Sequence, residues 1–420
     1  MIKSSQWFLL GSVALSVTGC GTAGPRDGES FRPGVGSAII ARTLGPVAID
    51  RSSRRLIVSS PAQGAGATSA TWGLISHPFI FPLGGDRYSL YYSFIGDEVA
   101  GHAGVAAADW PAYTENGGET WKFGDPFIWL DGKPRHATEA VREQAVIHHL
   151  GYGWGTVQLG NGARIGYHRD SASGGGDWRT LYGIWTRDGV HVHGPIPVPI
   201  RAHTRIDNLY LSPKALELED GVILALAYGR FHVHEIGLRW WSAAIFESND
   251  GGRSYDFKSF VARPEHSWGD EGANESDMVM LPNGEILCVL RTGAQGGSGF
   301  SHPMIIARSA DQGRTWTRRR MTLSGVNPRL HLMSDGTLVL GAGRPGSYLV
   351  FSRDNGHNWG SKVNLGRSGV QTSGYVDAVE VSPGKLLVVY DMLDFMDTDM
   401  HGIRQRINGV YTEFIHVTPR

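Results

Sequence analysis

The chain alternates between apolar runs and short polar reversals, and one pattern of this kind recurs six times. Each time, two apolar runs flank a glycine that is preceded by Asn, Asp, Gly or Pro. Asn-Gly and Asp-Gly between apolar runs are typical of β-hairpin turns, because both residues tolerate positive φ. The pattern therefore predicts six hairpins, over residues 77–93, 147–168, 208–230, 275–291, 327–344 and 375–391.

A second repeated element, of the form S-x-D-x-G-x-T-W, follows most of these hairpins. In its best copy, 309–316, Asp311 can accept backbone N–H bonds, Gly313 can take a positive φ, and Ser309 and Thr315 offer hydroxyls. Trp316 then starts the next strand with a large apolar anchor. Further copies are 352–359 and 248–255, with a weaker one at 114–121 and a degenerate one at 186–189. Each copy predicts a tight turn between strands.

Together these elements define a unit of four strands: a hairpin, a third strand, the turn and a fourth strand. Its recurrence predicts an all-β fold, a six-bladed β-propeller of four-stranded antiparallel blades. We expect an N-terminal strand, from the apolar segments 38–44 and 56–59, to complete the sixth blade and remove exposed sheet edges. A seventh blade built from residues 36–75 is the alternative.

Composition agrees with this fold and narrows the partners. The 58 glycines and 13 tryptophans among 420 residues suit short strands joined by tight turns, with aromatic side chains between sheets. The 39 basic and 40 acidic residues balance and form no basic tract, so nucleic acid is not expected as a partner. We expect a monomer that needs no cofactor.

The N-terminus has the features of a targeting segment. Lys3 is followed by the apolar residues 7–17, and Val17-Thr18-Gly19-Cys20 resembles a bacterial lipobox. This predicts a lipoprotein signal peptide over 1–19, lipidation of Cys20, a Gly-, Pro- and Ser-rich tether over 20–36, and one propeller domain over 37–420. The protein would lie at the bacterial cell envelope and touch the membrane through its lipid anchor only. An ordinary cleaved signal peptide or a short anchor is the alternative.

The S-x-D-x-G-x-T-W element resembles the Asp box of sialidases (neuraminidases) and related β-propellers. In that family the box is a structural turn, on the face away from the active site. The resemblance implies a carbohydrate-active enzyme that acts on acidic glycans, as a sialidase-like exo-glycoside hydrolase. It also implies structural roles for the box aspartates.

Polar residues open each predicted hairpin, and a propeller gathers equivalent strand ends around one funnel. These residues are His77, His148 or His149, Asn208, Tyr210, Glu275, Asp277, Asn327, Tyr375 and Asp377. Glu275 and Asp277 share a face because strand side chains alternate. A two-residue turn would pair Arg291 with Ser276, whereas a three-residue turn with a bulge would pair it with Glu275. A structural ion pair is the alternative role for Glu275 and Arg291.

Two segments are similar to sialidase segments that carry the catalytic site. The stretch 274–291 resembles the blade with a catalytic Glu and a substrate Arg, which favours pairing of Glu275 with Arg291. The stretch 374–391 resembles the segment with the tyrosine nucleophile, which implies Tyr375 as nucleophile and Glu275 as its base. The resemblance further implies that Arg291, Arg344 and Asp377 bind substrate and that an early-loop Asp, for which we take Asp97, is the general acid.

One sialidase motif has no counterpart in this chain. The family opens its first blade with F/Y-R-I-P, whose Arg completes a triad, whereas Phe31-Arg32-Pro33-Gly34 of the tether differs in sequence and context. Arg51, Arg54 and Arg55 are substitutes among which the sequence does not choose. The resemblance therefore covers roughly the C-terminal two thirds well and the N-terminal third poorly.

The second and third hairpins suggest another chemistry. His149 and His168 belong to the second hairpin, and Tyr210 and Arg230 to the third. Such a set could neutralise a uronate carboxylate and abstract the C5 proton, as in ulvan-lyase-like propellers. A polysaccharide lyase is thus the second hypothesis, and a non-catalytic glycan-binding lipoprotein is the third.

Two His-x-His pairs, His191 with His193 and His232 with His234, each place two rings on one strand face. They could form half a metal site, but no third ligand of fitting spacing stands out. We therefore expect no metal site.

Overall fold

The computed structural model describes residues 47–61, 76–93, 112–123, 127–130, 133–136, 154–169, 176–187, 191–232, 240–267, 271–293, 302–399 and 401–418. The chain divides into two units, Met1–Ile39 and Ile40–Arg420, and every described residue belongs to the second. The predicted signal peptide, Cys20 and tether lie outside these ranges. Within them, no helix combines the length and the apolar character that a membrane crossing requires.

A hairpin forms in each of the six predicted segments, although residues 147–153 of the second segment lie outside the described ranges. The hairpins are β2 (Ser76–Gly84) with β3 (Arg87–Ser93), β8 (Trp154–Gln158) with β9 (Arg164–Arg169), β11 (His191–Glu217) with β12 (Ile223–Phe231), β15 (Gly272–Met280) with β16 (Ile286–Gly293), β19 (Val326–Leu332) with β20 (Leu338–Gly343), and β23 (Val376–Ser382) with β24 (Lys385–Thr398). Their turn glycines take φ between 55° and 82°, as the dipeptides predict.

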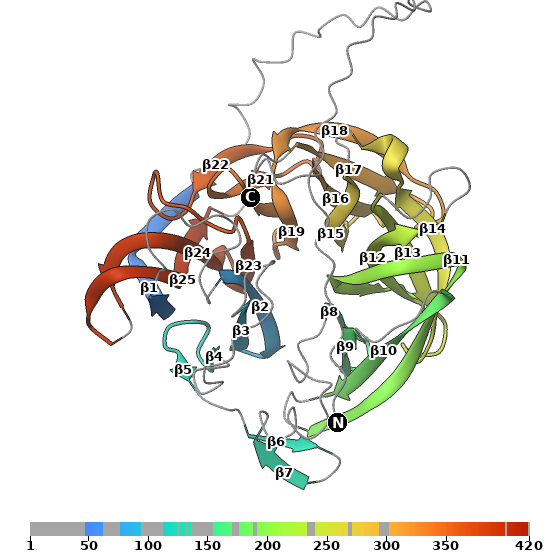
Figure 1. Ribbon diagram of the computed structural model, residues 1–420, viewed down its shortest axis with the longest axis horizontal. Coiled ribbons are helices and arrows are strands. Elements are labelled where there is room, and N and C mark those ends of the chain that lie inside the picture. The colour runs from blue at the N-terminus through green and yellow to red at the C-terminus, as the bar shows by residue number, and fades with distance from the viewer. Residues whose placement is uncertain are drawn as a thin grey trace, which may run out of the picture. The chain divides into compact units, whose positions relative to one another are not determined.

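Further strands extend the hairpins into sheets in a propeller arrangement (Figure 1). The added strands are β4 (Ala112–Thr114), β5 (Lys122–Phe123), β10 (Gly176–Thr186), β13 (Ser242–Ser248), β14 (Tyr255–Ala262), β17 (Pro303–Ser309), β18 (Thr317–Ser324), β21 (Ser347–Ser352), β22 (Gly360–Asn364) and β25 (Arg404–Val417). Neighbouring sheets contact one another through strands that begin the predicted hairpins: β11 meets β15, β15 meets β19, β19 meets β23, and β23 meets β2.

The predicted count of six blades is wrong, because the described residues form five sheets. The cause is β11, which runs for 27 residues without a break. Its first part pairs with β10 and its second part with β12, so the second and third repeats share one strand. They merge into a single nine-stranded sheet, which also takes in the short strands β6 (Phe127–Leu130) and β7 (Lys133–His136).

The repeated turn has the hydrogen bonds expected from its sequence. Asp311 Oδ1 accepts the backbone N–H groups of Arg314 at 3.1 Å and Thr315 at 2.9 Å, and Oδ2 accepts the Thr315 hydroxyl at 2.6 Å. These bonds, the hydroxyl bond first, lower the pKa of Asp311. Gly313 takes a φ of 78° and donates its N–H to Ser309 Oγ. The turns at 248–255 and 352–359 repeat the arrangement, and Asn116 replaces the aspartate in the turn at 114–121.

These turns lie at the sheet ends opposite to Glu275. β15 leads away from Glu275, β16 returns to Arg291, and β17 runs back until Ser309 pairs with Ile286 beside the hairpin turn. From this far end, Trp316 Nε1 reaches the neighbouring sheet and donates to Ser259 Oγ at 3.0 Å. The turns thus join neighbouring sheets at one end of the strands.

Apolar side chains fill the space between neighbouring sheets. Leu287, Val289 and Ile306 of the β15–β18 sheet, for example, pack with Leu340 and Val350 of the β19–β22 sheet, and all five are at most 2% exposed. Both faces of these sheets are covered, so second strands such as β16 and β20 begin as continuous apolar runs.

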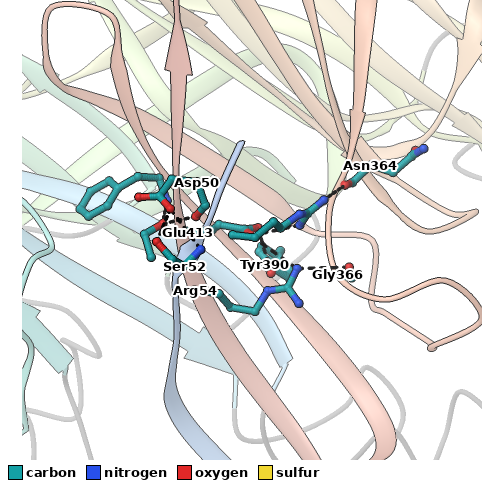
Figure 2. Close-up of polar contacts among 10 residues, drawn as sticks. Asp50, Ser52, Arg54, Asn364, Gly366, Tyr390 and Glu413 are labelled. Atoms are coloured by element: carbon teal, nitrogen blue, oxygen red, sulfur yellow. Dashed lines mark hydrogen bonds and ion pairs between the residues drawn. The ribbon is translucent and has the colours of Figure 1, made fainter. Parts of the chain in front are cut away.

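The N-terminal strand β1 (Val47–Pro61) completes the last sheet by pairing with β25. It contains the predicted segment 56–59, whereas the segment 38–44 lies outside the described ranges. Figure 2 shows polar contacts around it and labels Arg54, Tyr390 and Glu413. These three residues and Arg51, which pairs with Glu413, form what we call the closure cluster. The buried Glu413 carboxylate lies 2.9 Å from Arg51 Nη1 and 3.4 Å from Arg54 Nη2, and it accepts the Tyr390 hydroxyl at 3.2 Å. Arg51 and Arg54 therefore join β1 to the sheet.

Glu413→Gln tests the closure cluster. The change leaves two arginines without their buried counter-charge, so we expect the free energy of unfolding to fall by about 2–3 kcal/mol. The matched control is Glu119→Gln, which breaks a more exposed pair with Lys385 and should cost less than about 1 kcal/mol. Urea unfolding measures both variants, and equal stabilities would contradict the assigned role.

Candidate functional site

Polar groups from three sheets meet at the strand ends opposite the turns. The Tyr375 hydroxyl donates to Glu275 Oε1, while Glu275 Oε2 accepts Arg291 Nη1 at 2.9 Å and the backbone N–H of Asn327 at 2.8 Å. Glu275 lies in β15, Asn327 in β19, and Tyr375 directly precedes β23. We call Glu275, Asn327 and Tyr375 the site layer. Glu275, Arg291 and Tyr375 are partly exposed, whereas most residues around them in these strands are buried.

Strand register brings Glu275 and Arg291 together. Ser276 pairs with Leu290, and a bulge follows Ala273, so that Glu275 faces Arg291 across the two strands. This is the register of a three-residue turn, and the second of the two sequence alternatives is confirmed.

Aromatic contacts from the neighbouring sheet hold the Tyr375 ring. The His77 ring packs edge-on at 4.4 Å between centroids, and Phe79 packs likewise at 5.7 Å. Edge-to-face packing of this kind fixes ring orientation. The hydroxyl of Tyr375 is thereby directed at Glu275.

Arg344 approaches the same place from the end of β20. Its Nε donates to the carbonyl of Ser373 at 2.7 Å. A Cβ on Gly374 would lie 2.8 Å from Arg344 Cγ, and a Cβ on Gly343 would lie 2.3 Å from Gly374 Cα. Glycine is therefore required at both positions for the two strands to come this close.

Three non-glycine residues around the site have a left-handed backbone. His77, Asn327 and Arg344 take φ of 56°, 43° and 56°. Such conformations cost roughly 1–3 kcal/mol each and persist only where the surroundings enforce them. His77 packs against Tyr375, Asn327 belongs to the site layer, and Arg344 acts on Glu275 electrostatically. The fold therefore holds the backbone around the site in conformations that these residues disfavour.

A buried charge layer lies two residues further along the same three elements: Asp277, Arg329 and Asp377. Arg329, whose side chain is 3% exposed, is 3.0 Å from Asp377 and 3.8 Å from Asp277, and Lys214 of β11 lies 3.0 Å from Asp277. The two aspartates also accept backbone N–H bonds from the next sheets, at 2.8 and 3.2 Å. Because strand side chains alternate with a period of two, this layer supports the site layer directly.

Glu275 is held as the carboxylate. Burial raises its pKa, but the charge of Arg291, the hydrogen bonds from Tyr375 and Arg291, and the charge of Arg344 outweigh burial and lower the pKa to about 2. Burial lowers the pKa of Arg291, and the charges of Glu275 and Glu271 more than compensate, so this pKa is raised.

A second carboxyl group, Glu271, shares the same guanidinium. Its Oε2 lies 3.6 Å from Arg291 Nη2. Burial raises the pKa of Glu271, the Arg291 charge opposes this, and the negative charge of Glu275 adds to the rise. Two carboxyl groups beside one arginine thus have pKa values shifted in opposite directions.

The other predicted site residues lie elsewhere. Asp377 belongs to the buried charge layer. Its carboxylate already binds Arg329 and accepts the backbone N–H groups of Ile80 and Ala378. Asp97 and His149 lie outside the described ranges, and His168 is placed in β9 opposite Tyr182.

The two remaining residues of the lyase hypothesis belong to an aromatic cluster. Tyr210 is 37% exposed and stacks on Tyr228 with centroids 5.1 Å apart. Arg230 lies over the Trp241 ring, 4.8 Å from its centroid, and Trp241 packs against both tyrosines.

Two residues of the site were missed by sequence reasoning. Arg329 follows Asn327 by two positions, so strand alternation would have placed its side chain on the same face as Asn327, one layer further into the sheet. Glu271 precedes β15, and no motif marks it. Across the described ranges, no three His, Cys, Asp or Glu side chains are grouped so as to hold a metal ion.

No protein-family profile matches the sequence, and no curated protein matches it. The structure is similar to a protein of unknown function from Dyadobacter fermentans, with a TM-score of 0.52 and 16% identity over 87% of this chain and 100% of that one. It is also similar to the GH93 α-L-arabinofuranosidase of Fusarium graminearum, with a TM-score of 0.48 and 12% identity over 85% of this chain and 98% of that one. The NanB sialidase of Streptococcus pneumoniae gives a TM-score of 0.48 and 12% identity over 87% of this chain and 71% of that one. The first likeness supports the fold alone.

Stability at acid pH tests the ionised state of Glu275. Its folded pKa is depressed from 4.5 to about 2, so its stabilising contribution is complete above pH 4.5 and is lost as pH falls through 2. Between pH 6 and pH 3, the wild type should lose about 2 kcal/mol more unfolding free energy than Glu275→Gln. Urea unfolding at both pH values measures this, and parallel pH dependence of the two proteins would contradict the assignment.

Proposed function

We propose that this protein is a glycoside hydrolase acting on acidic glycans, a sialidase-like exo-enzyme with Tyr375 as its nucleophile. One observation carries the proposal: the Tyr375 hydroxyl donates to an ionised carboxylate, Glu275, at the partly exposed end of three sheets. A phenol is a weak nucleophile at neutral pH and needs such an acceptor for its proton. With Cys20 acylated, the enzyme would act on glycans outside the cytoplasm.

The reaction has two displacements. First, the Tyr375 oxygen attacks the anomeric carbon and its proton passes to Glu275, while the glycosidic C–O bond breaks and an acid protonates the departing oxygen. Second, water attacks the same carbon, gives its proton to the conjugate base of that acid, and releases Tyr375, which recovers its proton from Glu275. Retention of anomeric configuration follows.

The surrounding charges favour an anionic sugar. Arg291 and Arg344 both act on Glu275 electrostatically, and a guanidinium can bind a planar carboxylate through two parallel hydrogen bonds. A bound anion also places a second negative charge beside Glu275. This raises the pKa of Glu275 from about 2 and makes it a better proton acceptor when substrate is present.

Tyr375→Phe tests the nucleophile. We expect kcat on an aryl sialoside to fall by on the order of 10³-fold, because the acceptor for the glycosyl group is gone. Tyr348→Phe, which removes a buried tyrosine hydroxyl that donates to Ser324 O, is the matched control and should retain activity. Full activity of Tyr375→Phe would remove this residue from its role.

A second assay, run beside the aryl sialoside assay on the same variants, separates the other two hypotheses. A lyase would release unsaturated uronate, detected by ultraviolet absorbance, and would lose that activity in Tyr210→Phe while Tyr375→Phe retained it. Glycan binding without turnover in either assay would indicate a binding protein.

Arg344→Met tests the charge preference. Loss of the guanidinium should raise KM for an acidic glycoside by roughly 10–100-fold, because a charged hydrogen-bonding partner is removed. Arg314→Met, in the turn at 309–316 at the far end of the strands, should leave KM unchanged. Equal KM values for both variants would show that Arg344 does not bind the substrate anion.

A further inference from the structure

We propose that Glu271 is the proton donor to the departing oxygen in this reaction. The inference rests on the proposed function and names the acid that the function requires. Sequence reasoning placed that role at Asp97, which lies outside the described ranges.

Glu271 and Glu275 share Arg291 as their charged partner. Glu271 immediately precedes β15, and its Oε2 lies 3.6 Å from Arg291, the residue that also binds Glu275 at 2.9 Å. The two carboxyl groups therefore flank one guanidinium. The Glu271 side chain as a whole is 20% exposed, but its Oε2 is buried and accepts no hydrogen bond from the described residues. This oxygen is therefore left with a hydrogen-bonding capacity that a glycosidic oxygen could satisfy.

The backbone is shaped around this carboxyl group. The N–H of Glu271 donates to the carbonyl of Gly293 at 3.0 Å, and a Cβ on Gly293 would lie 1.9 Å from Glu271 Oε2. Only glycine at 293 leaves the carboxyl group its place. Glu271 is also secured from the other side, because its carbonyl accepts the backbone N–H of Trp241 at 3.0 Å.

Electrostatics assign different tasks to the two carboxyl groups. The charged groups acting on Glu271 are Arg291 of β16, Glu275 of β15 and Arg344 at the end of β20. Burial and the negative charge of Glu275 raise the pKa of Glu271 more than the two arginines and a hydrogen bond from Asn274 lower it, while the pKa of Glu275 is lowered to about 2. A pair of carboxyl groups whose environments push their pKa values apart is the usual arrangement of an acid and a base.

A protonated Glu271 also suits an anionic substrate. It is neutral, so it does not repel the sugar carboxylate. The two positive charges of Arg291 and Arg344 then outnumber the single negative charge of Glu275. In the step itself, the Glu271 hydroxyl proton moves to the glycosidic oxygen as the C–O bond breaks. The resulting carboxylate then takes the proton of the attacking water.

Leaving-group dependence tests the proposal, measured as kcat/KM for the wild type, Glu271→Gln and Asp97→Asn. A 2,4-dinitrophenyl glycoside needs no protonation to depart, whereas a disaccharide does. Glu271→Gln should lower kcat/KM for the disaccharide by on the order of 10³-fold and for the dinitrophenyl glycoside by less than about tenfold. It should also remove the alkaline limb of the pH profile, since that limb reports deprotonation of the acid.

Two further variants keep the test sharp. Gly293→Ala displaces the Glu271 carboxyl group without changing it, and should reproduce the leaving-group dependence in weaker form. Glu285→Gln, which breaks an ion pair with Arg308 at the other end of the same hairpin, should behave as wild type with both substrates.

The proposal is overturned if Glu271→Gln slows both substrates equally, or if Asp97→Asn alone shows the leaving-group dependence. Either result leaves the proposed function intact when Tyr375→Phe is inactive. Full activity of Tyr375→Phe would instead refute the proposed function itself.

Discussion

Buried charge pairing between first strands is the constraint on which this structure depends. Arg329 lies between Asp277 and Asp377, and the two carboxylates also hold backbone N–H groups of the next sheets. An unpaired charge at such a depth would cost several kcal/mol, so the three strands are locked in one relative register. Positions two residues away must then meet as well, and these are Glu275, Asn327 and Tyr375. The site is a consequence of strand alternation above a fixed layer.

The two ends of the strands have different tasks. At one end, hydrogen-bonded turns such as 309–316 join neighbouring sheets through local contacts that the sequence itself encodes. At the other end, Glu275 and Tyr375, which are 100 positions apart, share a hydrogen bond. His77, Asn327 and Arg344 around them take strained backbone conformations. The closure cluster around Glu413 ties the N-terminal strand to the last sheet.

Local signals in the sequence predicted the hairpins and turns, whereas they did not predict how the repeats combine into sheets. Glycine dipeptides predicted the six hairpins, and the turn motif predicted the hydrogen bonds within the turn. Both predictions depend only on residues that are close in the chain. The sheet count failed at β11, which runs unbroken from one repeat into the next although it contains Gly194 and four prolines, residues that usually interrupt a strand. For the site, the hairpin-opening residues Glu275, Asn327 and Tyr375 were predictable. Glu271 was not, because only a bulge and Gly293 bring it to Arg291.

Covalent labelling tests the central claim most directly. A fluorinated acidic glycosyl fluoride slows the second displacement more than the first, so a retaining hydrolase accumulates its glycosyl intermediate. Peptide mass spectrometry of the trapped protein should place the sugar on Tyr375. A sugar found on Glu275 or Glu271, or steady turnover of the reagent with inversion of configuration, would contradict the account.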